Sequence, residues 1–216
     1  KFSLPDGTQF ELLPGSNLHF PEGFTDSERE VSLEGEAFFD VTPDADRPFL
    51  VVTSDVTTKV LGTSFLVRAY KELKETVVAV KTGRVSVYAN HGHDSTSPAW
   101  SEPIILTPNQ QVIYDSEEQV AAKRLVEDPQ VILPTPTLGY TYTNARVTDL
   151  IEALEENYGI DILYDSAALA NCTITSDMSG AGFIDQIEII CNALGAEYEV
   201  SETSLSIEGG TGCTAK

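Results

Sequence analysis

The sequence has few of the residues from which catalytic and metal-binding sites are usually built. It contains three cysteines, three histidines, one methionine and one tryptophan in 216 residues. Basic residues are also scarce, because 13 Lys and Arg stand against 34 Asp and Glu, for a formal net charge of −21. Binding to nucleic acid or to anionic lipid headgroups depends on clustered Lys and Arg. The composition therefore excludes nucleic acid as a partner.

Long hydrophobic runs are missing as well. No apolar run approaches the roughly 20 residues that a membrane-spanning helix needs, so no direct membrane insertion of this chain is expected. A hydrophobic content of 41% in 216 residues still suffices for one large or two small domains with a real core.

The first 126 residues have the pattern of β-structure throughout. Within residues 29–70, three segments alternate apolar and polar side chains with period 2, which predicts short, half-buried antiparallel strands. The third of these segments runs through residues 60–67. Roughly ten such segments, separated by Gly, Pro and Asn turns, predict an all-β domain that is an irregular sandwich, jelly-roll-like or solenoid-like.

The pattern changes after a proline-rich linker at residues 127–137, which is expected to be stiff and extended. Apolar residues recur at helical spacing over residues 147–158 and again over 183–194, and Gly159 and Gly195 provide the stop signals. Short strands are expected around these helices. Residues 138–216 are therefore predicted to form a small α+β domain of the order βαβ–βαββ.

The first half of the chain resembles the FecR family of anti-sigma factors. The matching residues are Leu4-Pro5-Asp6-Gly7-Thr8, Arg29, Val31, Leu33, Gly35-Glu36-Ala37, Phe39, Val41, Arg47-Pro48-Phe49, Val51, Val60-Leu61-Gly62-Thr63 and Leu106-x-Pro108-x-Gln110-Gln111. Residues 138–216 resemble the short N-terminal domain of secretins and TonB-dependent receptors, and more closely the domain that follows FecR in Bacteroidota-type proteins. The residues that carry this second resemblance include Tyr142-Thr143-Asn144-Ala145, Leu150, Ala153-Leu154-Glu155, Tyr158-Gly159-Ile160, Asn171-Cys172 and Gly212-Cys213.

The resemblance implies a function in signalling across the envelope. It implies the periplasmic part of a single-pass inner-membrane anti-sigma factor, preceded in the whole protein by a sigma-binding cytoplasmic segment and one transmembrane helix. The expected partner is the N-terminal signalling domain of an outer-membrane TonB-dependent transducer, and the expected output is release of an extracytoplasmic-function sigma factor. No cofactor is needed.

Contact with that domain is expected through pairing of exposed strand edges. The expected contact strands are residues 160–164 and 204–207. Their candidate contact residues are Ile160, Ile162, Tyr164, Leu205 and Ile207.

The resemblance also bears on the cysteines, because a periplasmic location permits disulfides. The favoured pair is Cys172 with Cys213, which leaves Cys191 as a buried free thiol on a helix face. The alternative is that all three cysteines are reduced.

Self-cleavage is a feature of some FecR-like proteins, at a Gly-Thr bond that corresponds to Gly62-Thr63. The Thr hydroxyl would attack the preceding carbonyl in an N-to-O acyl shift, and the ester would then hydrolyse. Such cleavage would occur once per molecule and is not enzyme turnover. The alternative is a structural role, in which Gly62 avoids a clash and Thr63 makes a hydrogen bond.

Other candidate sites have simpler explanations, and no enzyme activity is predicted. Glu34 and Glu36 could act as an acid and a base, but a solvent-facing strand edge, or hydrogen bonds to neighbouring loops, explains them. A polar loop explains His91, His93 and Asp94, and a turn explains the glycines of residues 179–182, which lack the Lys-Ser or Lys-Thr of a phosphate loop. The alternative function is direct binding of carbohydrate or another ligand. The aromatic residues available for it are Trp100, Tyr88 and Tyr114.

Overall fold

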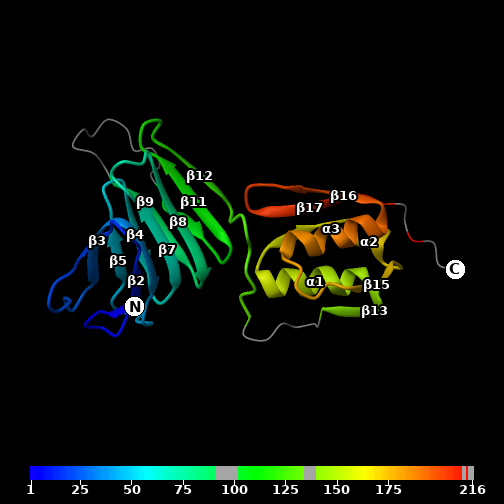
Figure 1. Ribbon diagram of the computed structural model, residues 1–216, viewed down its shortest axis with the longest axis horizontal. Helices are drawn as coiled ribbons and strands as arrows, with labels where there is room; N and C mark the ends of the chain where they lie inside the picture. Colours follow the sequence, from blue (N-terminus) through cyan, green and yellow to red (C-terminus); the bar gives the residue numbers. More distant parts are fainter. Residues whose placement is uncertain (91–101, 134–139, 211–212, 214–216) are drawn as a thin grey trace. The chain divides into compact units, whose positions relative to one another are not determined.

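The computed structural model describes residues 1–90, 102–133, 140–210 and 213. The chain divides into two compact units, residues 1–123 and 124–216 (Figure 1). The second unit includes part of the segment predicted as a linker. There, Val131 packs against the apolar core, and the N–H of Ile132 donates to the carbonyl oxygen of Asn157 at 2.8 Å. Residues 134–139 of the predicted linker lie outside the described residues.

The first unit is built from β-strands, as the sequence predicts. Its strands are β1 (Phe2–Ser3), β2 (Gln9–Leu12), β3 (Asn17–His19), β4 (Arg29–Asp40), β5 (Phe49–Val52), β6 (Val56–Val60), β7 (Ser64–Ala69), β8 (Glu75–Thr82), β9 (Val85–Ala89), β10 (Ile104–Leu106), β11 (Gln110–Asp115) and β12 (Val120–Leu125), the last of which continues across the division.

Strand β4 organises this unit because its two halves pair with different neighbours. Its first half pairs with β3 and β5, and its second half pairs with β2 and β7. One arm of the sheet therefore runs β4-β5-β6-β9-β10, and the other runs β4-β7-β8-β11-β12. The change of partner occurs at Gly35, which has φ +108° and lies so close to Ser16 that a Cβ would stand 2.6 Å from the Ser16 Cα.

Two features differ from the sequence prediction. Strands β4 and β5 pair in parallel, not antiparallel, because residues 41–48 carry the chain back before β5 begins. The segment expected as one strand over residues 60–67 is two strands, with a break at residues 61–63 between β6 and β7, which lie in different arms of the sheet. Alternation continues across such a break, so periodicity alone does not reveal it.

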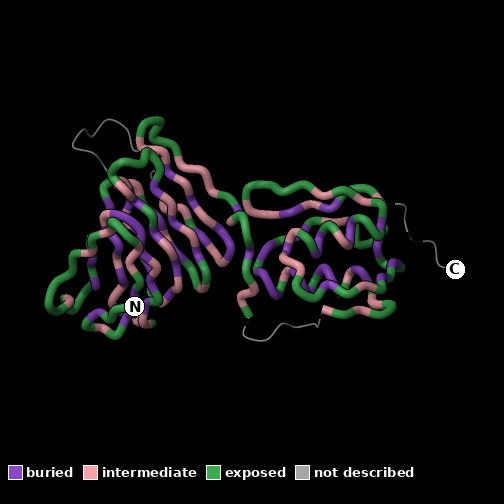
Figure 2. Tube along the Cα trace, viewed as in Figure 1, coloured by how far each residue is buried: buried purple, intermediate pink, exposed green. Residues whose placement is uncertain are grey.

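Buried residues alternate with more exposed ones along the strands of the first unit (Figure 2), and the buried side chains of β4 belong to its core. Val31, Leu33, Ala37 and Phe39 are buried, as their spacing predicts. The ring of Phe39 stacks on that of Phe65, with 5.5 Å between centroids. The aromatic core therefore fixes the position of β7 against β4.

The second unit contains three helices and five complete strands among the described residues. Its elements are β13 (Thr141–Arg146), α1 (Val147–Tyr158), β14 (Asp161–Leu163), α2 (Ser166–Leu169), β15 (Thr173–Asp177), α3 (Phe183–Leu194), β16 (Ala196–Val200) and β17 (Ser204–Gly209). Both long helices span the predicted residues and end at glycines with left-handed φ, +66° at Gly159 and +63° at Gly195. This order is the predicted βαβ–βαββ with the short helix α2 added.

The strands of the second unit form two small sheets with α1 and α3 between them (Figure 1). Strands β13 and β15 pair antiparallel. The other sheet has the order β14-β17-β16, in which β14 and β17 are parallel. None of the helices in the described ranges has the length and apolar character to cross a bilayer.

Candidate functional site

The central strand of the three-stranded sheet contradicts part of the predicted contact surface. Strand β17, which carries Leu205 and Ile207, lies between β14 and β16 and has both backbone edges paired. Both side chains point into the core, where Leu205 is fully buried and Ile207 is 7% exposed. The prediction of edge pairing through residues 204–207 is therefore wrong, since a hairpin pattern does not show on which side a third strand will add.

Strand β14 lies at an edge of this sheet, as edge pairing requires. Ile160 and Ile162 are buried in the core, and Tyr164 is half-buried, so these two isoleucines offer a partner strand their backbone and not their side chains. The exposed apolar side chain here belongs to Leu163, which is 61% exposed. Burial, followed by the carboxylates of Glu152, Glu155 and Asp149, raises the pKa of Tyr164 and keeps its phenol neutral.

The edge of β14 is already occupied at one point. The backbone N–H of Ile162 donates to the Oε1 of Glu155, a residue of α1, at 2.7 Å. A charge-assisted bond of this kind is stronger than a neutral one, so a strand added at Ile162 would have to displace the carboxylate. Sequence reasoning missed this contact, because the two residues belong to different elements and no motif connects them.

Strand β16 forms the opposite edge of the same sheet. The N–H of Ser201 donates to the carbonyl of Ser204 on the other strand at 2.9 Å, so the backbone groups of Ser201 point toward β17. Successive residues of an antiparallel strand direct their backbone groups to opposite edges, and the N–H groups of Tyr198 and Val200 therefore point to the outer edge. The Tyr198 hydroxyl donates to Glu188 on α3 at 3.1 Å. Val200 is 46% exposed, so this edge offers both backbone groups and an apolar side chain.

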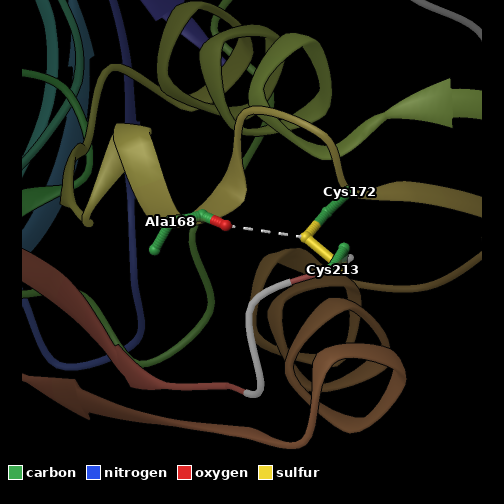
Figure 3. Close-up of a disulfide and its surroundings, with 3 residues drawn as sticks. All are labelled: Ala168, Cys172 and Cys213. Atoms are coloured by element: carbon green, nitrogen blue, oxygen red, sulfur yellow. Dashed lines mark hydrogen bonds between the residues drawn. A yellow bond between two sulfur atoms is a disulfide. The ribbon is translucent and has the colours of Figure 1, made fainter. Parts of the chain in front are cut away.

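The structure joins Cys172 to Cys213 by a disulfide (Figure 3), and it leaves Cys191 as a buried free thiol. The Sγ of Cys172 lies 3.9 Å from the carbonyl oxygen of Ala168. A disulfide sulfur carries no proton, so this is a packing contact. Burial, and then the charge of Glu188, raises the pKa of the Cys191 thiol, which keeps it protonated and unreactive near neutral pH.

Gly62 and Thr63 lie in the connection between β6 and β7. A Cβ on Gly62 would stand 2.6 Å from the Cα of Pro43, so only glycine fits here. Thr63 is 3% exposed, and its hydroxyl donates to the carbonyl oxygen of Arg84 at 3.1 Å. The carbonyl of Thr63 in turn accepts from the N–H of Val41 at 3.0 Å. These contacts are the ones that a structural role of the pair requires.

The two carboxylates of β4 are separately paired. Glu36 binds Arg68 through both of its oxygens, at 2.9 and 3.2 Å, and Glu34 pairs with Lys71 at 2.6 Å. Each carboxylate thus holds its own cation on a neighbouring strand or loop. Glu36 is 7% exposed, so the expectation of a solvent-facing carboxylate is wrong for this residue. The two ion pairs stabilise the sheet around β4, and they leave neither carboxylate poised as an acid or base for a substrate.

The remaining candidates do not gather into a site. Tyr114 is 8% exposed, with a pKa raised by burial and then by nearby carboxylates. Of the two proposed sugar-stacking residues that the structure describes, only Tyr88 presents its ring at the surface. His91, His93, Asp94 and Trp100 lie outside the described residues. Among the residues that are described, no group of three or more His, Cys, Asp and Glu could hold a metal ion.

Comparison with known proteins places both units in one family. The model of the FecR protein family matches residues 1–86, and the model of the FecR C-terminal domain matches residues 139–207. No curated protein matches the chain. Two crystal structures of a proposed anti-sigma factor from Parabacteroides distasonis, at 2.50 and 1.65 Å resolution, are each 29% identical to it with a TM-score of 0.53. The alignments cover 97% of this chain and 93% and 94% of those chains. The chain therefore belongs to the FecR family of anti-sigma factors, which are regulatory proteins and not enzymes.

Proposed function

We propose that this chain is the periplasmic, signal-receiving part of a single-pass inner-membrane anti-sigma factor. In this proposal it binds the N-terminal signalling domain of an outer-membrane TonB-dependent transducer. Binding then controls the release of an extracytoplasmic-function sigma factor, which is held by a cytoplasmic segment of the same protein. The observation that carries the proposal is the match of the FecR C-terminal domain to residues 139–207, a unit with strand edges suited to partner pairing.

The contact would form by strand addition at the sheet β14-β17-β16. Backbone hydrogen bonds to an added strand supply affinity, and exposed side chains beside them supply specificity. Strand β16 offers the longer edge, with five residues against three for β14. Leu163 and Val200 are the exposed apolar side chains nearest these edges. No step of this function uses a cofactor or metal.

Charge supports a protein partner with basic character. After Arg124, the only basic residues of the chain are Arg146 and Lys216. A surface of one sign accelerates association with a partner of opposite sign and excludes partners of the same sign. We therefore expect the association rate with the signalling domain to fall as salt is added.

The proposal is tested by calorimetric titration of the chain against the signalling domains of the TonB-dependent transducers encoded beside its gene. Saturable binding to one of them is expected, and deletion of residues 138–216 should abolish it. Leu163→Lys and Val200→Lys should weaken binding by about tenfold if their edge is the one used, as for other contact residues that matter. Val120→Lys provides the matched control, because Val120 is a 58% exposed strand valine in the first unit.

The proposal would be contradicted if none of the signalling domains encoded beside the gene binds the chain, with both proteins shown to be folded. The direct ligand-binding function would then be the better explanation, and a screen of glycans and iron complexes would test it.

A further inference from the structure

The first unit contains a groove that the proposed function does not use. It has a volume of about 660 Å³, which is within the usual range for ligand pockets. Strands β6 and β9 form its floor, and the loop at residues 43–45 forms one wall. The lining residues are Pro43, Asp44, Ala45, Lys59, Val60, Leu61, Gly62, Thr63, Arg84, Ser86 and Tyr88.

The wall of the groove is fixed in place. The N–H of Asp44 donates to the carbonyl of Leu61 at 2.7 Å, and Pro43 packs directly on the Cα of Gly62. The carboxylate of Asp44 accepts from the side chain of Arg47 at 2.9 Å and from two backbone N–H groups of its own loop. Its negative charge is therefore already balanced within the loop, and the shape of the groove does not depend on a ligand.

The floor presents its side chains in rows. Thr57 lies opposite Tyr88, and Lys59 lies opposite Ser86, in the register of β6 and β9. Leu61 directly follows β6 and Arg84 directly precedes β9, and the alternation of buried and exposed residues continues into both, which places them on the same outer face. Each strand thus offers one outward side chain for every two residues, a repeat of roughly 6.8 Å along the groove.

The charge of the groove is opposite to that of the protein. Lys59 and Arg84 are both exposed, and among the described residues neither takes part in an ion pair within 4.0 Å. Arg84 stands two residues before Ser86, the partner of Lys59, so Lys59 and Arg84 are diagonal neighbours whose backbones lie about 7–8 Å apart, and both cations line the same groove. The apolar side chains beside them are Leu61, 49% exposed, and Tyr88, 38% exposed. The groove therefore presents two cations that lack a described ion-pair partner, with apolar side chains beside them. Such a surface is complementary to a ligand that carries both negative charge and an apolar group.

We propose that this groove binds an extended acidic peptide segment of a partner protein. Every second side chain of an extended peptide points to the same side, with the same repeat as the rows of the floor. A segment in which acidic residues alternate with small ones could therefore place two carboxylates on Lys59 and Arg84. An apolar residue two positions further would then reach Leu61 or Tyr88. Both edges of β6 and β9 are paired, so the peptide would lie on the face of the sheet and not extend it.

A peptide fits these features better than an acidic glycan. Sugar binding uses aromatic rings as stacking platforms, and Tyr88 is the one ring among the lining residues. The other apolar lining side chains are aliphatic, from Pro43, Ala45, Val60 and Leu61, and they suit a leucine-sized side chain. The site is separate from residues 139–207, so it would add a second protein contact to the one proposed for the second unit.

The test is an NMR titration of the whole chain with the peptide acetyl-Leu-Ser-Glu-Ser-Glu-Ser-Leu-amide, which reads the same in either chain direction. We expect amide shifts that saturate and that cluster at residues 57–63 and 84–88. The same peptide with Gln in place of Glu should bind about tenfold more weakly or not at all, because bonds to charged groups are the stronger ones. Lys59→Gln and Arg84→Gln should each weaken binding of the acidic peptide by about tenfold.

The control variant is Lys74→Gln, which removes a surface lysine that is paired with Glu117 and lies away from the groove. It should leave binding unchanged, and the amide spectrum of each variant shows whether the first unit is folded. Absence of saturable shifts, or shifts that persist in Lys59→Gln and Arg84→Gln, would overturn the proposal. Tighter binding of oligogalacturonate than of the peptide, at the same residues, would also overturn it and would identify the groove as an acidic-glycan site.

Discussion

The guanidinium of Arg29 and the carboxylate of Asp6 form a buried ion pair. The Nη1 of Arg29 lies 2.7 Å from the Oδ2 of Asp6, and the two side chains are 1% and 5% exposed. Arg29 also donates to the carbonyl oxygens of Arg47 and Thr42, at 2.9 and 2.8 Å. Asp6 in turn accepts from the N–H and hydroxyl of Thr8. One residue pair thus connects the N-terminal turn, the start of β4 and the crossover to β5.

Removal of either partner should destabilise the first unit severely, because the remaining charge would stay buried without its counter-ion. We expect Asp6→Ala to lower the free energy of unfolding by about 3–5 kcal/mol. Urea denaturation measures this change, with hydrogen exchange of the first unit's amides as the readout. Asp26→Ala, at an exposed position with no described ion pair, should change it little. An exposed ion pair contributes at most about 1 kcal/mol. If Asp6→Ala lowers the free energy of unfolding by less than that, the buried pair does not have the stabilising role that is expected of it.

Gly35 should not tolerate even one added methyl group. Its φ of +108° disfavours any side chain, and a Cβ would lie 2.5–2.6 Å from three atoms of Ser16, one of them in the backbone. We expect Gly35→Ala to cost more than about 2 kcal/mol, from strain and overpacking together. Gly23→Ala is the matched control, because a Cβ there meets nothing within 4 Å. Equal melting temperatures of the two variants would contradict this expectation. They would show that β4 can change from one set of partner strands to the other at a residue other than Gly35.

The parts of the fold that local sequence determines were predictable. Helices α1 and α3 follow from apolar spacing and from the glycines that end them. The short helix α2 was missed because four residues show no periodicity. A signal was nevertheless present, since the side chain of Asp165 caps the N–H groups of Ala167 and Ala168.

The parts that depend on contacts between separate elements were not predictable. The parallel partner of β4, the central position of β17 and the contact of Glu155 with Ile162 each join segments that local patterns do not connect. The groove was missed for the same reason. Lys59 and Arg84 are far apart in the chain, and only the pairing of β6 with β9 places them on one face.

The disulfide should stabilise the second unit and should be the only oxidised pair. Reduction is expected to lower the free energy of unfolding of that unit by about 2–4 kcal/mol, as for other disulfides that close loops of tens of residues. Mass spectrometry after alkylation of the denatured chain should show one alkylated cysteine before reduction and three after it. In the native chain Cys191 should react only slowly, because burial and then Glu188 raise its pKa. Three alkylated cysteines in unreduced protein would exclude the bond.

The Gly62-Thr63 bond is expected to remain intact. The hydroxyl of Thr63 donates a hydrogen bond to the carbonyl of Arg84. Among the described residues, no side chain accepts a hydrogen bond from this hydroxyl. An N-to-O shift needs such an acceptor to activate the hydroxyl. Intact mass measurement after several days at 37 °C checks this, with Thr63→Ala as the control. Two fragments divided between residues 62 and 63 in the unaltered chain, and absent in Thr63→Ala, would instead establish self-cleavage.

Glu155 should control whether the edge of β14 is open. Its carboxylate holds the N–H of Ile162 at 2.7 Å, beside the exposed side chain of Leu163. In Glu155→Ala this N–H loses its partner, and an edge with an unpaired donor and an exposed leucine is prone to pair with another chain. We therefore expect Glu155→Ala to associate in a concentration-dependent way in analytical ultracentrifugation. Glu155→Gln keeps an oxygen acceptor and should remain like the unaltered chain.

The control is Glu152→Ala, which removes an exposed carboxylate of the same helix that also acts on Tyr164 but makes no described hydrogen bond to the backbone of β14. If β14 is the edge used by the signalling domain, Glu155→Ala should also bind that domain more tightly, because no carboxylate has to be displaced first. If β16 is the edge used, the affinity for the domain should stay the same while self-association still appears. Monomeric Glu155→Ala with unchanged affinity would show that water replaces the carboxylate at Ile162 and that Glu155 does not close this edge.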